Sequence, residues 1–146
     1  MSAAPTLFLA VRRVIRAKPE RVFAAWTTPS ALKAWWGPPG VDCEAAVVDA
    51  RVGGCYRIDN RLVDGRLIVI SGQFLAVDSP HRLQFSWNVE PGGGAESLVA
   101  VAFETHHEGT LVRIEHSSIA DDATRKDHEL GWRGCLDGLA EYTAGD

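Results

Sequence analysis

The sequence of 146 residues is 46% hydrophobic and 23% charged, and its formal net charge at pH 7 is -4. A chain of this length predicts a single domain over residues 1–146, with one hydrophobic core. The mild negative charge provides no attraction to nucleic acid or to an anionic membrane, so neither is expected as a partner.

Cysteine usage and the first residues bear on cellular location. Cys43, Cys55 and Cys135 are odd in number and contain no Cys-x-x-Cys pair, which argues against a disulfide framework and against a zinc ribbon. Residues 1–6 lack a basic region, and the apolar run 7–11 is too short for a signal peptide or a membrane span. We therefore expect free thiols and a cytoplasmic protein.

The N-terminal quarter of the chain predicts one strand and two short helices. Residues 7–16 alternate apolar and basic side chains near their end, which is typical of a strand. Pro19 and Pro29 each suit the first position of a helix, because proline lacks the N–H that would be unpaired there. Thr28 is expected to cap the second helix with its hydroxyl, and the Gly-Pro-Pro-Gly run 37–40 ends that helix.

Three of the five tryptophans, Trp26, Trp35 and Trp36, lie in these two helical segments. We assign Trp26 to the core. Adjacent helical positions differ in direction by about 100°, so at most one of Trp35 and Trp36 faces inward. We expect that one to form a wall of a ligand cavity; the competing interpretation gives both indoles a purely structural role, in the core and over the sheet edge.

Residues 43 to 117 alternate between runs typical of strands and short turns. The predicted strands cover residues 43–48, 55–60, 67–77, 82–88, 97–106 and 110–117. The turns between them, including Gly53-Gly54, Asp64-Gly65 and Gly92–Gly94, are too short for a parallel crossover. The six strands should therefore form an antiparallel meander.

Alternation along three of these strands assigns the two faces of the sheet. The residues expected on the apolar face are Leu83, Phe85, Trp87, Val99, Val101, Phe103, Val112, Ile114 and His116. Those expected to point away are Gln84, Ser86, Arg113 and Glu115. A helix from Ala123 to about Thr143, begun by Asp121-Asp122, should cover the apolar face.

The predicted C-terminal helix contains three glycines, Gly131, Gly134 and Gly138. Each glycine costs about 1 kcal/mol relative to alanine in a helix interior, so propensity does not explain them. Either another segment approaches the helix closely at these positions, or the missing side chains leave space for a ligand. Sequence alone favours neither explanation.

Several motifs, in this order of elements, resemble a known family. They are the segment Pro19 to Gly40, the Asp49-x-Arg51-x-Gly53-Gly54 turn, Gly72, the run from Asp78 to Trp87, and Gly131-Trp132. Together they resemble the bacterial relatives of the C-terminal domain of the activator of the heat-shock protein 90 ATPase, within the START-like (SRPBCC) superfamily. The resemblance implies an α+β helix-grip fold of order β-α-α-β6-α, in which a curved antiparallel sheet wraps a long C-terminal helix around an internal cavity.

Members of this superfamily mostly bind hydrophobic small molecules, which implies a carrier, sensor or resistance role with a ring-containing ligand between the sheet and the last helix. The expected ligand-binding residues are Trp35, Trp36, Tyr56, Phe74, Phe85, Trp87, Phe103, His116, Gly131, Trp132 and Cys135. His116 is the first choice for a polar contact. The competing interpretations are a hydrogen-bonded core histidine and, for Cys135, a small buried apolar side chain.

Two other functions are also compatible with the sequence. A stress-related or chaperone-linked interaction module follows from the family namesake alone, and direct ATPase activation is not expected because these 146 residues lack the namesake's additional N-terminal domain. A cavity-based cyclase or hydrolase would need an internal acid or base, for which the pattern offers only His116.

No catalytic residue, cofactor or metal site is predicted from the sequence. His106 and His107 would point to opposite faces of their strand and so could not share one metal ion. Relatives often form dimers, so a homodimer is a further expectation.

Overall fold

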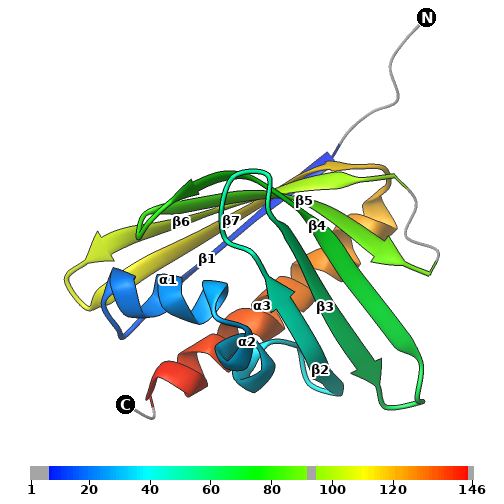
Figure 1. Cartoon of the computed structure of the whole chain (residues 1–146), viewed down its shortest axis with the longest axis horizontal. Helices are drawn as coiled ribbons and strands as arrows, with labels where there is room; N and C mark the ends of the chain where they lie inside the picture. Colours follow the sequence, from blue (N-terminus) through cyan, green and yellow to red (C-terminus); the bar gives the residue numbers. More distant parts are fainter. Residues whose placement is uncertain (1–6, 92–94, 145–146) are drawn as a thin grey trace, which may run out of the picture.

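A curved antiparallel sheet encloses one long helix in the computed structural model of the chain, which describes residues 7–91 and 95–144 (Figure 1). The strands are β1 (Leu7–Ile15), β2 (Val41–Val48), β3 (Cys55–Leu62), β4 (Leu67–Asp78), β5 (Arg82–Glu90), β6 (Ser97–His106) and β7 (Gly109–Ile119). The helices are α1 (Pro19–Thr27), α2 (Pro29–Trp35) and α3 (Asp122–Ala144). The helix-grip α+β fold expected from the sequence is confirmed.

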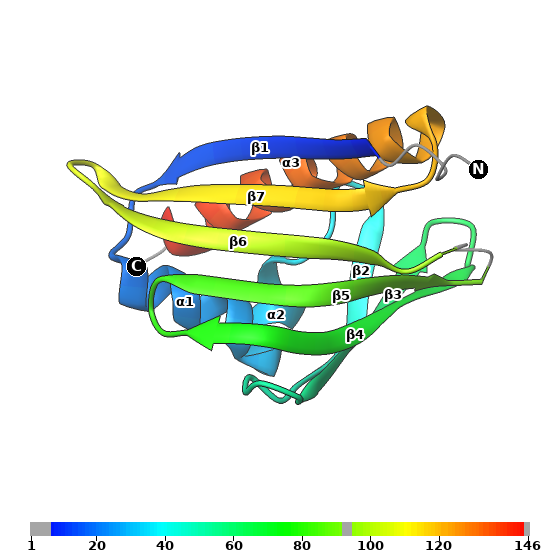
Figure 2. The same cartoon turned by 90° about the horizontal axis from the view of Figure 1, so that it is seen from above.

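The seven strands are ordered β1-β7-β6-β5-β4-β3-β2, so β2 to β7 form the predicted meander and β1 pairs beside β7 (Figure 2). Most strands extend one or two residues beyond their predicted ends. Residues 1–6 and the predicted Gly92–Gly94 turn lie outside the described residues.

The concave face of the sheet carries the core. All nine residues predicted on the apolar face are buried, His116 included. Helix α3 covers this face and buries Trp132, Cys135, Leu136, Leu139 and Thr143, while α1 and α2 close one end of it (Figure 1).

The pairing of β4 with β5 is irregular, with a register shift between Phe74 and Ala76. Ser86, which was expected to point away from the core, is buried between the lining residues Phe85 and Trp87 in sequence, and its hydroxyl accepts a hydrogen bond of 2.9 Å from the backbone N–H of Gln73. A Cβ at Gly72 would lie 1.9 Å from the Ser86 carbonyl oxygen, so this close approach of the strands requires glycine. The irregular pairing bends the sheet around α3.

The two predicted proline starts of the short helices are confirmed, whereas the predicted hydroxyl cap of Thr28 is wrong. Pro19 and Pro29 occupy the first turns of α1 and α2, as predicted. Thr28 does not cap α2 with its hydroxyl; its carbonyl instead accepts the Leu32 N–H at 3.0 Å, and Pro29 leaves one donor fewer to be capped. Asp121 accepts the Thr124 N–H at 2.7 Å at the start of α3, and this hydrogen bond lowers the pKa of its carboxyl.

Across residues 7–91 and 95–144, none of the helices has the length and hydropathy needed to cross a bilayer.

Candidate functional site

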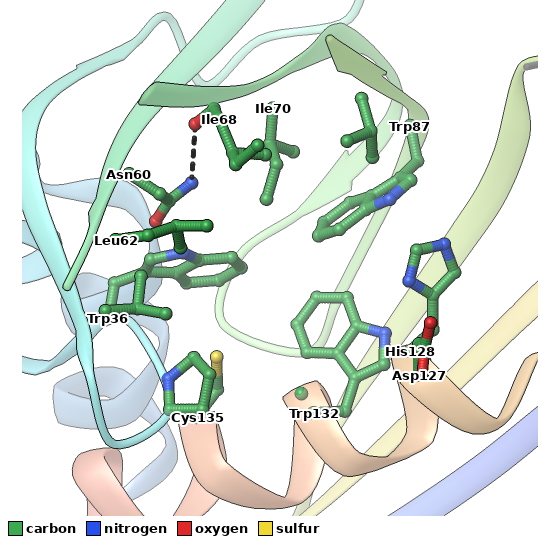
Figure 3. Close-up of a pocket in the computed structure, with 14 residues that line it drawn as sticks. Trp36, Asn60, Leu62, Ile68, Ile70, Trp87, Asp127, His128, Trp132 and Cys135 are labelled. Carbon is green, nitrogen blue, oxygen red and sulfur yellow. Dashed lines mark hydrogen bonds between the residues drawn. The ribbon is translucent and has the colours of Figure 1, made fainter. Parts of the chain in front are cut away.

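A cavity of about 200 Å³ lies between the N-terminal half of α3 and strands β2 to β5 (Figure 3). The strands contribute Val41, Asn60, Leu62, Ile68, Ile70, Trp87 and Val89 to its lining. Helix α3 contributes Asp127, His128, Gly131, Trp132 and Cys135, and the segment after α2 contributes Trp36 and Pro38. Apart from Asp127 at the rim, the lining carries no carboxylate, and it carries no lysine or arginine.

Three indoles form the aromatic part of this lining. The ring centroids of Trp36 and Trp132 are 5.5 Å apart at an interplanar angle of 87°, and those of Trp87 and Trp132 are 5.0 Å apart at 47°. Figure 3 shows the three rings around the cavity, with Ile70 between Trp36 and Trp87 on the strand side. Such tilted and edge-to-face arrangements favour a further aromatic ring in the same cluster.

The two adjacent tryptophans of the lid segment have separate roles. Trp35 is the last residue of α2, and its indole N–H donates a 2.9 Å hydrogen bond to the carbonyl of Ala25. Trp36 follows the helix with an extended backbone, φ -69° and ψ 138°, and lines the cavity. The two indoles therefore point in different directions, because α2 ends between Trp35 and Trp36.

The three glycines of α3 combine both explanations offered by the sequence. A Cβ at Gly131 would meet no neighbour within 4 Å among the described residues, and Gly131 lies in the middle of the helix face that lines the cavity. A Cβ at Gly134 would lie 2.6 Å from the Cβ of Pro38, and one at Gly138 would lie 2.5 Å from the carbonyl oxygen of Trp35. Gly131 thus contributes space, whereas the other two permit close packing.

Three of the expected ligand-binding residues line a different, much smaller space. Tyr56, Phe74 and Phe85 surround a pocket of about 20 Å³, which has room for about one water molecule. The Tyr56 hydroxyl donates a 2.6 Å hydrogen bond to the Ser86 carbonyl, and burial raises its pKa. These side chains support the sheet behind the larger cavity.

Phe103, also expected at the site, lies in the core at the other end of the sheet. Its ring packs edge-to-face against Phe23 and Trp26, with centroids 5.4 and 6.0 Å away. It lines neither of the two cavities.

His116 is fully buried beside the cavity, behind Trp132. The Trp132 indole N–H donates to His116 Nδ1 at 3.1 Å, so Nδ1 carries no proton. The proton of the neutral ring is therefore on Nε2, which donates to Ser97 Oγ at 2.7 Å. Both ring nitrogens are occupied by protein partners, which leaves His116 without a free atom for a ligand.

Acidification should destabilise the fold through His116. Burial, and secondarily the nearby His128, lower the pKa of His116 from 6.5 to about 3. His116 therefore binds a proton near pH 6.5 in the unfolded chain, whereas in the folded chain it stays neutral until the pH approaches 3. The free energy of unfolding is unaffected by this group above pH 6.5. It falls by up to about 1.4 kcal/mol per pH unit as the pH is lowered toward 3. His128, whose pKa is lowered by burial, acts in the same direction.

Urea unfolding of the wild type and of His116→Gln at pH 7.5 and 5.5 measures this effect. The variant should lose part of the wild type's decline in unfolding free energy, because glutamine does not titrate. An NMR titration in which His116 protonates near pH 6.5 would contradict the prediction.

Asn60 is the polar group that sequence reasoning missed. It is 3% exposed, and its Nδ2 donates to the carbonyls of Ile58 and Ile68 at 3.4 and 3.3 Å, whereas Oδ1 has no partner among the described residues. Alternation along β3 could have indicated it, because Tyr56, Ile58 and Asn60 share one face.

Strand alternation and helix periodicity could also have indicated other lining residues that the sequence analysis did not name. Ile68 and Ile70 share a face of β4, and His128 lies four residues before Trp132 on α3. Cys135, which was expected, does line the cavity; burial raises the pKa of its thiol to about 12, so it is an apolar wall and not a nucleophile at neutral pH.

Comparison with known proteins places this geometry among bacterial relatives. Residues 16–144 match a family described as Activator of Hsp90 ATPase homolog 1-like protein. The crystal structure of a Chromobacterium violaceum protein is 27% identical over 92% of this chain and 94% of its own, with a TM-score of 0.85. The crystal structure of the AHSA1 protein from Silicibacter pomeroyi is 28% identical over 94% and 98% of the two chains, also with a TM-score of 0.85. No curated protein matches significantly.

Proposed function

The chain belongs to the Activator of Hsp90 ATPase homolog 1-like family, and from this membership and the cavity we propose that it binds a hydrophobic, ring-containing small molecule. Proteins of the wider superfamily commonly bind hydrophobic ligands. The observation that carries the proposal is the apolar cavity enclosed by Trp36, Trp87 and Trp132. Such binding suits a carrier, sensor or resistance role.

The volume of the cavity limits the size of the ligand. An apolar cavity of about 150 Å³ is sufficient to bind benzene in a protein interior. A space of about 200 Å³ that is open on one side therefore suits one ring or two fused rings, with any further substituent outside.

The lining also favours an uncharged ligand. It offers no lysine or arginine to pair with a carboxylate or phosphate, and burial keeps His128 neutral by lowering its pKa. Fatty acids are accordingly disfavoured, although their chains are apolar.

The direct test is isothermal titration calorimetry with naphthalene derivatives, alongside tryptophan fluorescence. Three of the five tryptophans line the cavity, so a bound ring should change the emission. We expect a dissociation constant on the order of 10 µM, or about -7 kcal/mol. At 100 times that concentration the ligand should add about 2.7 kcal/mol to the stability of the fold and raise Tm by roughly 5 to 10 °C.

Palmitate serves as the non-ring, charged control and should give neither heat nor a Tm shift. Absence of both signals with every one-ring and two-ring compound would overturn the proposed function.

A further inference from the structure

A second space, the polar pocket, adjoins the apolar cavity near the start of α3. It measures about 140 Å³ and shares Trp87, Val89 and His128 with the lining of the cavity. Its other polar side chains are Ser97, Ser118, Asp121 and Thr124. Figure 3 shows His128 next to Trp87 and Trp132, on the α3 side of the cavity. The two spaces therefore meet at His128 and Trp87.

Hydrogen bonds run in one direction from Trp132 through His116 to Ser97. Because Trp132 donates to Nδ1 of His116, the His116 proton is on Nε2 and is donated to Ser97 Oγ, 2.7 Å away. Ser97 Oγ is the acceptor in this bond, so its own proton must be donated elsewhere. Ser97 is 5% exposed, and its hydroxyl proton has no acceptor among the described residues. An unpaired donor of this kind in a pocket wall indicates an acceptor from outside the chain.

The register of the sheet places the Ser97 hydroxyl on the side of the polar pocket. Ser97 on β6 is paired directly with Trp87 on β5, and paired residues project from the same face of a sheet.

His128 provides a second donor from the α3 side. Its ring stacks on that of His116, with centroids 4.7 Å apart, and neither of its nitrogens is hydrogen-bonded within the part of the chain that the structure describes. Burial lowers the pKa of His128, so the ring is neutral at pH 7 and carries one N–H.

The charge of the polar pocket excludes anionic acceptors. Hydrogen bonds from Thr124 lower the pKa of Asp121, which is therefore ionised at neutral pH, and the lining contains neither lysine nor arginine. A carboxylate or phosphate would be repelled there. A carbonyl oxygen is uncharged, and its two lone pairs can accept from both Ser97 and His128.

We propose that the ligand is an uncharged aromatic ketone, whose rings lie among Trp36, Trp87 and Trp132 and whose carbonyl oxygen, on a short arm, accepts the hydroxyl proton of Ser97 in the polar pocket. This inference rests on the proposed function and identifies the substituent that extends outside the apolar cavity. Ser97 is thereby the residue that determines specificity, and the indoles supply the general affinity for rings.

Calorimetry with 4-(2-naphthyl)butan-2-one and 2-(3-methylbutyl)naphthalene tests the assignment, because the second compound has a methyl group in place of the carbonyl oxygen. The wild type should bind the ketone at least about tenfold more tightly, although the hydrocarbon is the more hydrophobic of the two. Ser97→Ala should reduce this ratio to within about twofold. Ser117→Ala is the matched control, because Ser117 lies on β7 outside both linings, and it should keep the wild-type ratio.

Naphthalene, which has no arm, separates the two proposals. If the wild type binds naphthalene but prefers neither armed compound, or binds neither of them, the ketone assignment is overturned and the proposed function stands. If none of the three binds, both fail. A preference for the ketone that persists in Ser97→Ala would place the carbonyl elsewhere and overturn the role of Ser97; because the wild-type ratio is informative by itself, the test does not depend on the variant folding.

Discussion

Replacing Gly131 by leucine should reduce the affinity for ring compounds by at least about 100-fold, equivalent to about 2.7 kcal/mol, without unfolding the protein. Gly131 lies at the centre of the α3 face that lines the cavity, and its missing side chain leaves open space there. A leucine side chain would occupy the volume that the ligand needs. Calorimetry with 2-naphthol measures the affinity, and thermal unfolding measures the stability.

The control for this change is Arg133→Leu, which adds leucine to an exposed position of the same helix outside the cavity lining. It should bind as the wild type does. Unaltered binding by a folded Gly131→Leu protein would show that the ligand lies elsewhere and would count against the proposed cavity.

The second large effect concerns stability, and we expect Gly138→Ala to cost roughly 2 kcal/mol. The new Cβ would lie 2.5 Å from the carbonyl oxygen of Trp35, a backbone atom that cannot rotate aside. Overpacking of this kind costs about 1 to 3 kcal/mol or more, which exceeds the gain of about 1 kcal/mol in helix propensity. Tm should fall by roughly 4 to 8 °C.

Gly131→Ala provides the opposite result in the same helix. The substitution has the same propensity gain and meets no neighbour, so it should stabilise the fold by up to about 1 kcal/mol. Urea unfolding of the two alanine variants measures both signs. Equal stabilisation by both substitutions would mean that the segment after α2 can shift to accommodate a methyl group. The close contact would then not require glycine at position 138.

Patterns that repeat within one element were sufficient to predict most of the fold. Alternation placed Leu83, Val101 and Ile114 correctly on the buried face, because a strand's two faces are determined by period two. The turns between the strands are too short for a parallel crossover, so neighbouring strands had to be antiparallel. Alternation did not indicate the burial of Ser86, which accompanies its hydrogen bond with the Gln73 backbone on β4.

The site was predicted less completely, because it depends on contacts between distant parts of the chain. The sequence identified Trp36, Trp87 and Trp132 as candidates. It could not separate them from Phe103, another aromatic residue of the buried face, which lies at the other end of the sheet. Nor could it indicate that Trp132 and Ser97 occupy both nitrogens of His116, since these partners lie 16 and 19 residues away.

The contacts of Gly134 and Gly138 also join two walls of the cavity, the segment after α2 and helix α3. The loop from Trp35 to Pro38 lies directly against α3, because glycine at these two positions removes the side chains that would separate them. Helix α3 is further held against β1, where Arg13 pairs with Asp137. The opposite wall, which carries Leu62 and Ile68, is formed by β3 and β4, inside the sheet between β2 and β5. The segment with Trp36 therefore belongs to the helix side of the cavity.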